Sequence, residues 1–190
     1  MTFPARARHT SGFLDFYDGR WDDCEAQLGM AASAYHEAGD IHGWGGAVLM
    51  HSFVAYFRGD LARAASMTSG LVRAGEDAAD PQVATWGCQN LAYPGLATGP
   101  LDDVVAILGK GHALARKIPS WQSLAYQLAL FAKCLVLQGG LAEAEAALDE
   151  SRQLLKREKL DSAFDRVEML TARAMALLAN ADRLQGAPHA

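Results

Sequence analysis

Almost every long segment of the chain has the pattern of a helix, and the alternation of β-branched and polar residues that predicts strands is missing. Short breaks rich in Gly, Pro and Asp separate these segments. The helices are predicted at 21–38, 42–58, 61–77, 81–98, 101–117, 121–138, 141–158 and 161–180. The sequence therefore predicts an all-α protein.

Four of the breaks contain a glycine, and these glycines are evenly spaced along the chain. Each is followed two residues later by a large apolar residue. The glycines are Gly19, Gly59, Gly99 and Gly139, and the apolar residues are Trp21, Leu61, Leu101 and Leu141. We expect these glycines to adopt the left-handed conformation that ends a helix. Further breaks lie half a period away, and a fixed period of this length is typical of stacked helical hairpins.

Small residues recur at two fixed distances from the glycines. Seven residues before them lie Ser52, Ala92, Ala132 and Ala172, and five residues after them lie Cys24, Ala64, Val104 and Ala144. Small side chains let two helices approach closely, so these positions are predicted to be buried where the helices of one hairpin meet.

The segments FRGDLARAA (57–65) and LQGGLAEAE (137–145) resemble the tetratricopeptide repeat, which places Gly-Asp-aromatic between a small residue and an alanine. The resemblance covers roughly residues 12–180. A 40-residue period, longer than the usual ~34 residues, is similar to the divergent arrays of bacterial nucleotide cyclases and maltose-regulator-type transcriptional regulators. The resemblance implies antiparallel hairpins stacked in a right-handed superhelix.

The predicted organisation is a single helical-repeat domain over residues 1–190. The repeats are expected at about 41–79, 81–118 and 121–158, with partial or capping helices at 12–38 and 161–180. The tails, 1–10 and 185–190, are expected to be frayed.

The resemblance also implies that the helix before each glycine lines a concave face. The residues implied to face it are Phe53, Tyr56, Trp86, Gln89, Tyr93, Tyr126, Lys133, Arg166 and Arg173. Most of the residues up to Tyr126 are aromatic, and the last three, from Lys133 onward, are basic. Such a face suits a protein or peptide segment, or a small effector with an apolar and an anionic end. The alternative is that these side chains pack the interior of the array.

Catalytic motifs such as G-x-S-x-G, the P-loop and H-E-x-x-H do not occur. The glycine-rich stretch GWGGAV (43–48) follows no predicted strand, so it is interpreted as a tight helix start rather than a phosphate loop. Cys24, Cys88 and Cys134 form no C-x-x-C motif. The sequence therefore predicts no enzyme activity, no cofactor and no metal.

The composition supports a packed core, with 51% hydrophobic residues, and the net charge of −5 argues against direct nucleic-acid binding. Three cysteines are typical of reduced, buried thiols. No apolar run is long enough to span a membrane, and MTFPARARHT lacks the apolar core of a secretion signal. We expect a cytoplasmic protein with no membrane partner.

These observations favour a non-catalytic protein- or peptide-binding or regulatory module. A second interpretation is a small-molecule sensor domain of a signalling protein, either a cyclase or a transcriptional regulator. A third is a self-association scaffold, in which a homodimer forms through the last helix along Met169, Ala172, Met175 and Ala176.

Overall fold

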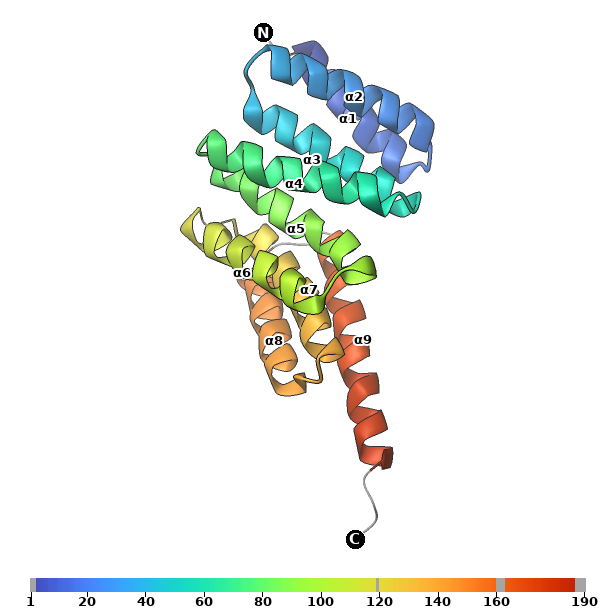
Figure 1. Ribbon diagram of the computed structural model, residues 1–190, viewed down its shortest axis with the longest axis vertical. Coiled ribbons are helices and arrows are strands. Elements are labelled where there is room, and N and C mark those ends of the chain that lie inside the picture. Colours follow the sequence, from blue (N-terminus) through green and yellow to red (C-terminus); the bar gives the residue numbers. More distant parts are fainter. Residues whose placement is uncertain (1–2, 119, 160–162, 187–190) are drawn as a thin grey trace. The chain divides into compact units, whose positions relative to one another are not determined.

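The computed structural model describes residues 3–118, 120–159 and 163–186, and these form helices joined by short turns (Figure 1). The helices are α1 (Phe3–Tyr17), α2 (Trp21–Glu37), α3 (Ile41–Phe57), α4 (Leu61–Asp77), α5 (Pro81–Thr98), α6 (Leu101–Lys117), α7 (Trp121–Leu137), α8 (Leu141–Arg157) and α9 (Ala163–Gly186). No strand occurs in these three ranges. The predicted all-α array of helices is confirmed, and most predicted helix boundaries agree to within one or two residues.

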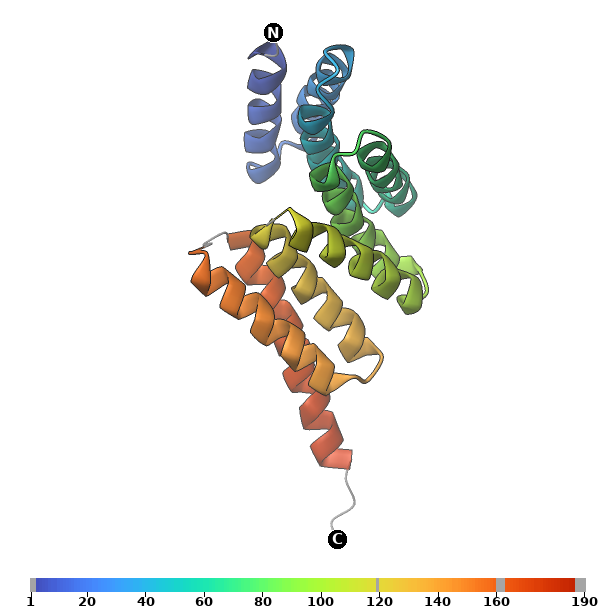
Figure 2. The same ribbon diagram turned by 90° about the vertical axis from the view of Figure 1, so that its left-hand side faces the viewer.

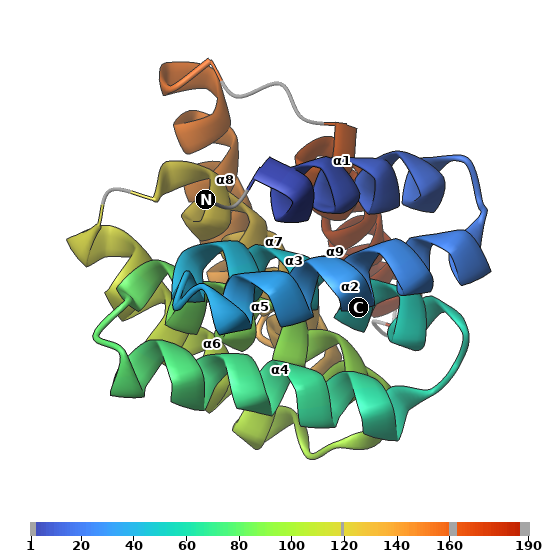
Figure 3. The same ribbon diagram turned by 90° about the horizontal axis from the view of Figure 1, so that it is seen from above.

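The helices form two compact units, which are described separately. Unit 1 spans Met1–Gly99 and contains α1–α5, and unit 2 spans Pro100–Ala190 and contains α6–α9. Within each unit a helix packs against the next one along the chain, and α3 also contacts α5, as α7 contacts α9. In unit 1, α1 and α4 lie on opposite sides of α2 and α3 (Figures 2 and 3). The boundary between the two units lies at Gly99, within the range that the sequence analysis treats as a single helical-repeat domain.

The turns recur at a regular interval along the chain, and most of them contain a left-handed residue just after the helix end. Gly19, Gly39, Gly59 and Gly139 have φ of +73°, +68°, +81° and +82°. Ala79 and Lys159 fill the same role with φ of +51° and +53°. The next amide donates back across the turn, as from Asp60 N to the Ala55 carbonyl at 2.9 Å and from Gly140 N to the Leu135 carbonyl at 2.9 Å.

Gly99 departs from this pattern, and the expectation that all four glycines are left-handed is wrong at this position. Gly99 is extended, with φ −100° and ψ 168°. The cause is Pro100, which has no N–H to donate across the turn and which restricts the preceding residue to extended conformations. The boundary between the two units therefore lies where the repeating turn is lost.

The tails also differ from the prediction. Residues 3–10, predicted to be frayed, belong to α1, which packs on α2. Gly12 makes this possible, because a Cβ there would lie 2.7 Å from Leu28 Cγ. Gly12 precedes Gly19 by seven residues, which is the small-residue spacing found in the other hairpins. At the other end α9 includes Gln185 and Gly186, and residues 187–190 lie outside the described residues.

The predicted rows of small residues are buried. Cys24, Ser52, Ala64, Ala92, Val104, Ala132, Ala144 and Ala172 are all at most 3% exposed. In unit 2, Ala132, Ala144 and Ala172 join a core with Leu124, Leu128 and Leu148, formed mainly between α7, α8 and α9. Glycines give the closest approach in unit 1, because a Cβ on Gly87 would lie 2.6 Å from the Val72 main-chain nitrogen. No helix in the described part of the chain is long and apolar enough to cross a membrane.

The contact between α4 and α5 gives a direct test of this packing. A Cβ on Gly75 would lie 2.3 Å from the main-chain nitrogen of Ala84, so Gly75→Ala must push the two helices apart. We expect it to lower the free energy of unfolding by about 1–3 kcal/mol, measured by urea denaturation. Gly70→Ala, in the same helix, is the matched control. Nothing lies within 4 Å of its added Cβ, so we expect a gain of up to about 1 kcal/mol. Equal stability of the two variants would contradict this packing.

Candidate functional site

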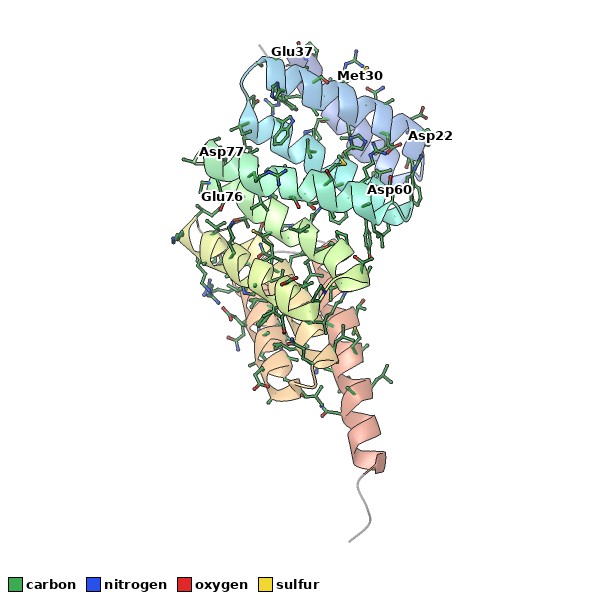
Figure 4. The ribbon with its side chains drawn as sticks, viewed as in Figure 1. Asp22, Met30, Glu37, Asp60, Glu76 and Asp77 are labelled. Atoms are coloured by element: carbon green, nitrogen blue, oxygen red, sulfur yellow. The ribbon has the colours of Figure 1, made fainter. Side chains whose placement is uncertain are left out.

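Three helices of unit 1 form a common surface. Successive helices are antiparallel, so α1, α3 and α5 run in the same direction, and α3 contacts both α1 and α5. We call the surface formed by α1, α3 and α5 the first-helix face. Figure 4 shows its two ends: Asp22 and Asp60 begin α2 and α4 at one end of unit 1, and Glu37 and Asp77 lie at the other.

An aromatic cluster occupies the end of the first-helix face near Asp22 and Asp60. Phe53 is its centre, with ring centroids 6.4 Å from Phe16, 6.2 Å from Phe57 and 5.5 Å from Tyr93. Tyr56 extends it, 5.2 Å from Tyr93 and 5.4 Å from Phe57. These separations are those of directly interacting rings. The cluster therefore joins α1, α3 and α5 through side chains.

Part of the aromatic cluster is open to solvent. Phe13, Tyr17 and Phe57 are 41%, 59% and 46% exposed, and Leu14 beside them is also exposed. The rings of Phe13 and Tyr17 lie 4.9 Å apart. Tyr17 packs against the half-buried Phe16 at 5.4 Å, and Phe57 packs against the buried Phe53 at 6.2 Å, so each of these two exposed rings rests on a more buried one.

The structure brings together three of the predicted site residues, Phe53, Tyr56 and Tyr93, in this cluster. Trp86 lies apart from it, with its ring 4.9 Å from the His42 ring. Gln89 is buried in α5. The predicted residues of unit 1 therefore do not form one continuous set, since Trp86 belongs to the opposite end of the face.

The remaining predicted residues belong to unit 2. Tyr126 is buried in α7, and Lys133 is half-buried in the same helix. Arg173 is exposed on α9, where it lines a hollow with Arg152 of α8. Arg166 lies in α9, and its side chain is outside the described residues. Within unit 2 these residues do not gather into a single site.

The sequence analysis missed the contributions of α1 and of the last residue of α3. Phe13, Phe16 and Tyr17 lie in a segment predicted only as a partial or capping helix. Phe57 was missed because it lies next to the turn glycine. A usable signal was present, since Tyr17 and Phe57 both precede a turn glycine by two residues.

The side chain of His51 on α3 contacts an ion-pair network formed by residues of α2 and α4 and by Arg58. Glu25 accepts from Arg63 at 2.8 Å and lies 3.4 Å from both Arg58 and His51. Arg63 Nη2 also lies 2.8 Å from His51 Nε2. Burial, and then the nearby Arg63 charge, lower the pKa of His51. This histidine is thus a neutral member of a structural network.

The described titratable groups do not assemble into a nucleophile or a metal site. Burial raises the pKa of Cys24 and of Cys134 to about 11, so both thiols stay protonated at neutral pH. Cys88 is buried as well. Nor do three His, Cys, Asp or Glu side chains meet anywhere in the described residues as metal ligands would.

The ridge considered for self-association is largely covered within unit 2. Ala172 and Ala176 are 0% and 2% exposed and pack in the core with α7 and α8, and Met169 packs against the same core. The exposed large apolar residues of α9 are instead Leu170, Leu177 and Leu178. A dimer through the predicted ridge would require this core to open.

The buried histidines predict how stability depends on pH. Burial lowers the pKa of His9, His51 and His112 below the ordinary 6.5. Between the two pKa values of each histidine, the unfolded chain binds a proton that the folded chain does not. The free energy of unfolding is therefore highest above about pH 6.5, and it falls as the pH drops toward the lowered pKa values of the folded chain. We expect His112→Gln to reduce this fall, measured by urea denaturation at about pH 7.5 and pH 5.5.

His36→Gln is the control, because His36 is exposed near the end of α2. It should leave the pH dependence of wild type in place. The interpretation fails if the His112 variant loses as much stability on acidification as the His36 variant.

No protein-family model and no curated protein matches this chain. The candidate site therefore depends on the geometry of the first-helix face alone.

Proposed function

We propose that this chain is a non-catalytic binding module, and that the aromatic cluster of unit 1 binds an apolar peptide segment. The observation that carries the proposal is the exposure of Phe13, Tyr17 and Phe57 in a cluster whose inner rings are the half-buried Phe16 and the buried Phe53. Contiguous exposed apolar side chains are typical of interaction surfaces.

Aromatic rings suit this role for a physical reason. Each ring offers a large contact area and loses little conformational entropy when it is immobilised. Phe57 already contacts Phe16, Phe53 and Tyr56, so much of its ordering is complete before a partner arrives. Such preorganisation strengthens binding because less freedom is lost in the complex.

The charges beside the aromatic cluster suggest the chemistry of the segment. The two bordering turns and the helix starts that follow them span residues 18–25 and 58–63. Their carboxylates are Asp18, Asp22, Asp23, Glu25 and Asp60, and their basic residues are Arg20, Arg58 and Arg63. Because acidic groups are in excess, the best partner is an apolar segment flanked by Lys or Arg.

The resemblance to tetratricopeptide arrays supports the same proposal, since such arrays use the first helices of their hairpins to hold peptides. The divergent 40-residue arrays occur in signalling proteins, so a regulatory role in such a protein is the wider form of the proposal. The small effector considered in the sequence analysis would use a different part of the face.

Panning a random peptide library displayed on phage against the full chain tests the proposal. We expect the selected peptides to combine aromatic or aliphatic anchors with Lys or Arg. The double variant Tyr17→Ala, Phe57→Ala should weaken their binding by about tenfold or more, measured by fluorescence polarisation, because it removes two exposed aromatic contacts.

Leu137→Ala provides the matched control. Leu137 is 54% exposed and precedes Gly139 in unit 2, as Phe57 precedes Gly59 in unit 1. This variant should bind the selected peptides as wild type does. The proposal is wrong if the library yields no binding peptide, or if the double variant folds normally and retains full affinity.

A further inference from the structure

A pocket lies at the opposite end of the first-helix face from the aromatic cluster, near the starts of α3 and α5. Its volume is about 420 Å³, and it is lined by Arg6, His9, Tyr35, Asp40, His42 and Trp86 together with two glycines. His9 and Phe16 are seven residues apart on α1, which places the pocket and the aromatic cluster about 10 Å apart along the helix. The pocket is therefore a separate feature that the proposed peptide site does not use.

The two glycines let the rings of the pocket wall pack directly against the start of α3. A Cβ on Gly43 would lie 2.5 Å from the Tyr35 ring, and a Cβ on Gly46 would lie 3.0 Å from the His9 ring. Gly45, between them, instead faces Val83 of α5. The glycine-rich stretch GWGGAV thus packs closely against Val83 on one side and against the Tyr35 and His9 rings on the other.

The polar groups that line the pocket are mostly donors without partners. Tyr35, Trp86 and His9 form no side-chain hydrogen bond with any residue that the structure describes. Arg6 forms no ion pair with a carboxylate in that part of the chain. Burial, followed by the charge of Asp40, raises the pKa of Tyr35, so its hydroxyl remains a donor at neutral pH. Arg6 is exposed, and His9 and Trp86 are half-buried, so these donors can reach a ligand that supplies acceptors.

Asp40 is the only carboxylate among the described residues that line the pocket, and it already serves the protein. Its Oδ1 accepts from the Gly43 amide at 2.8 Å and caps the start of α3. The other nearby carboxylate, Asp80, lies 3.3 Å from His42 Nδ1 and caps α5 through the amides of Gln82 and Val83. Arg6 is the one arginine or lysine of the described lining, and its guanidinium can bind a carboxylate through two parallel hydrogen bonds.

The pocket also has flat apolar walls. The Trp86 and His42 rings lie 4.9 Å apart, and the His9 and Tyr35 rings meet edge to face at 6.1 Å. Aromatic walls with a few convergent polar groups are typical of small-molecule sites. From these observations we propose that the pocket binds a small planar carboxylate, with its anionic group at Arg6 and its ring against Trp86.

NMR of the ¹⁵N-labelled full chain, titrated with benzoate, tests this inference. The readout is the indole N–H signal of Trp86, which Trp86→Phe identifies among the four tryptophans. We expect a saturable shift with a Kd on the order of 1 mM, the range for a ligand of this size. Benzamide, which has the same shape without the charge, should bind at least about tenfold more weakly.

Variants of two arginines on α1 distinguish a direct contact between Arg6 and benzoate from a general effect of removing a positive charge. Arg6→Gln should weaken benzoate binding about tenfold, because it removes the charged donor. Arg8→Gln should have no effect, because Arg8 lies outside the pocket and contacts Met30 Sδ at 3.0 Å. Gly46→Ala should also weaken binding, because its Cβ narrows the pocket beside His9.

Inorganic phosphate tests whether the pocket accepts any anion. It should shift the Trp86 signal less than benzoate at equal concentration, since it has no ring to pack against Trp86. The inference is overturned if benzoate leaves the Trp86 signal unchanged, if benzamide or phosphate binds equally well, or if Arg6→Gln binds like wild type. None of these outcomes would affect the peptide proposal, which uses Tyr17 and Phe57 instead.

Discussion

The left-handed residue that ends a helix and reverses the chain is the constraint on which the rest of this structure depends. Most of the helices are equal in length and are joined by turns of equal length, so each hairpin takes up the same stretch of chain. Within each unit, helices one full period apart therefore run in the same direction and in register. Contacts such as Phe53 with Tyr93 follow directly, because the two residues are one period apart on neighbouring first helices.

Much of the fold could be predicted from the sequence because turn glycines and small interface residues are local signals. The same reasoning could not identify Ala79 and Lys159 as left-handed residues, since neither side chain favours that conformation. It also failed at Gly99, where the following proline overrides the preference of glycine. The first part of α1 was predicted to be a frayed tail although Gly12 carried the expected spacing, because residues 3–10 are rich in basic and polar residues.

The candidate sites were less predictable because each combines helices that are distant in the sequence. The resemblance to tetratricopeptide repeats implied that Phe53, Tyr56 and Tyr93, at fixed distances before the turn glycines of α3 and α5, face one side. It could not identify the partners of these residues on α1. The pocket was harder still, because Gly43 and Gly46 contribute to it by lacking side chains. The sequence alone does not distinguish these two glycines from one that serves helix packing, such as Gly45.

The central claim is that α1, α3 and α5 lie in register and form one face. Nuclear Overhauser effects between aromatic ring protons measure this most directly. The account predicts cross-peaks between Phe53 and Tyr93, whose ring centroids are 5.5 Å apart, and between Phe16 and Phe57, at 5.9 Å. If these cross-peaks are absent while the helices are intact by circular dichroism, the three helices do not form this face and the account is contradicted.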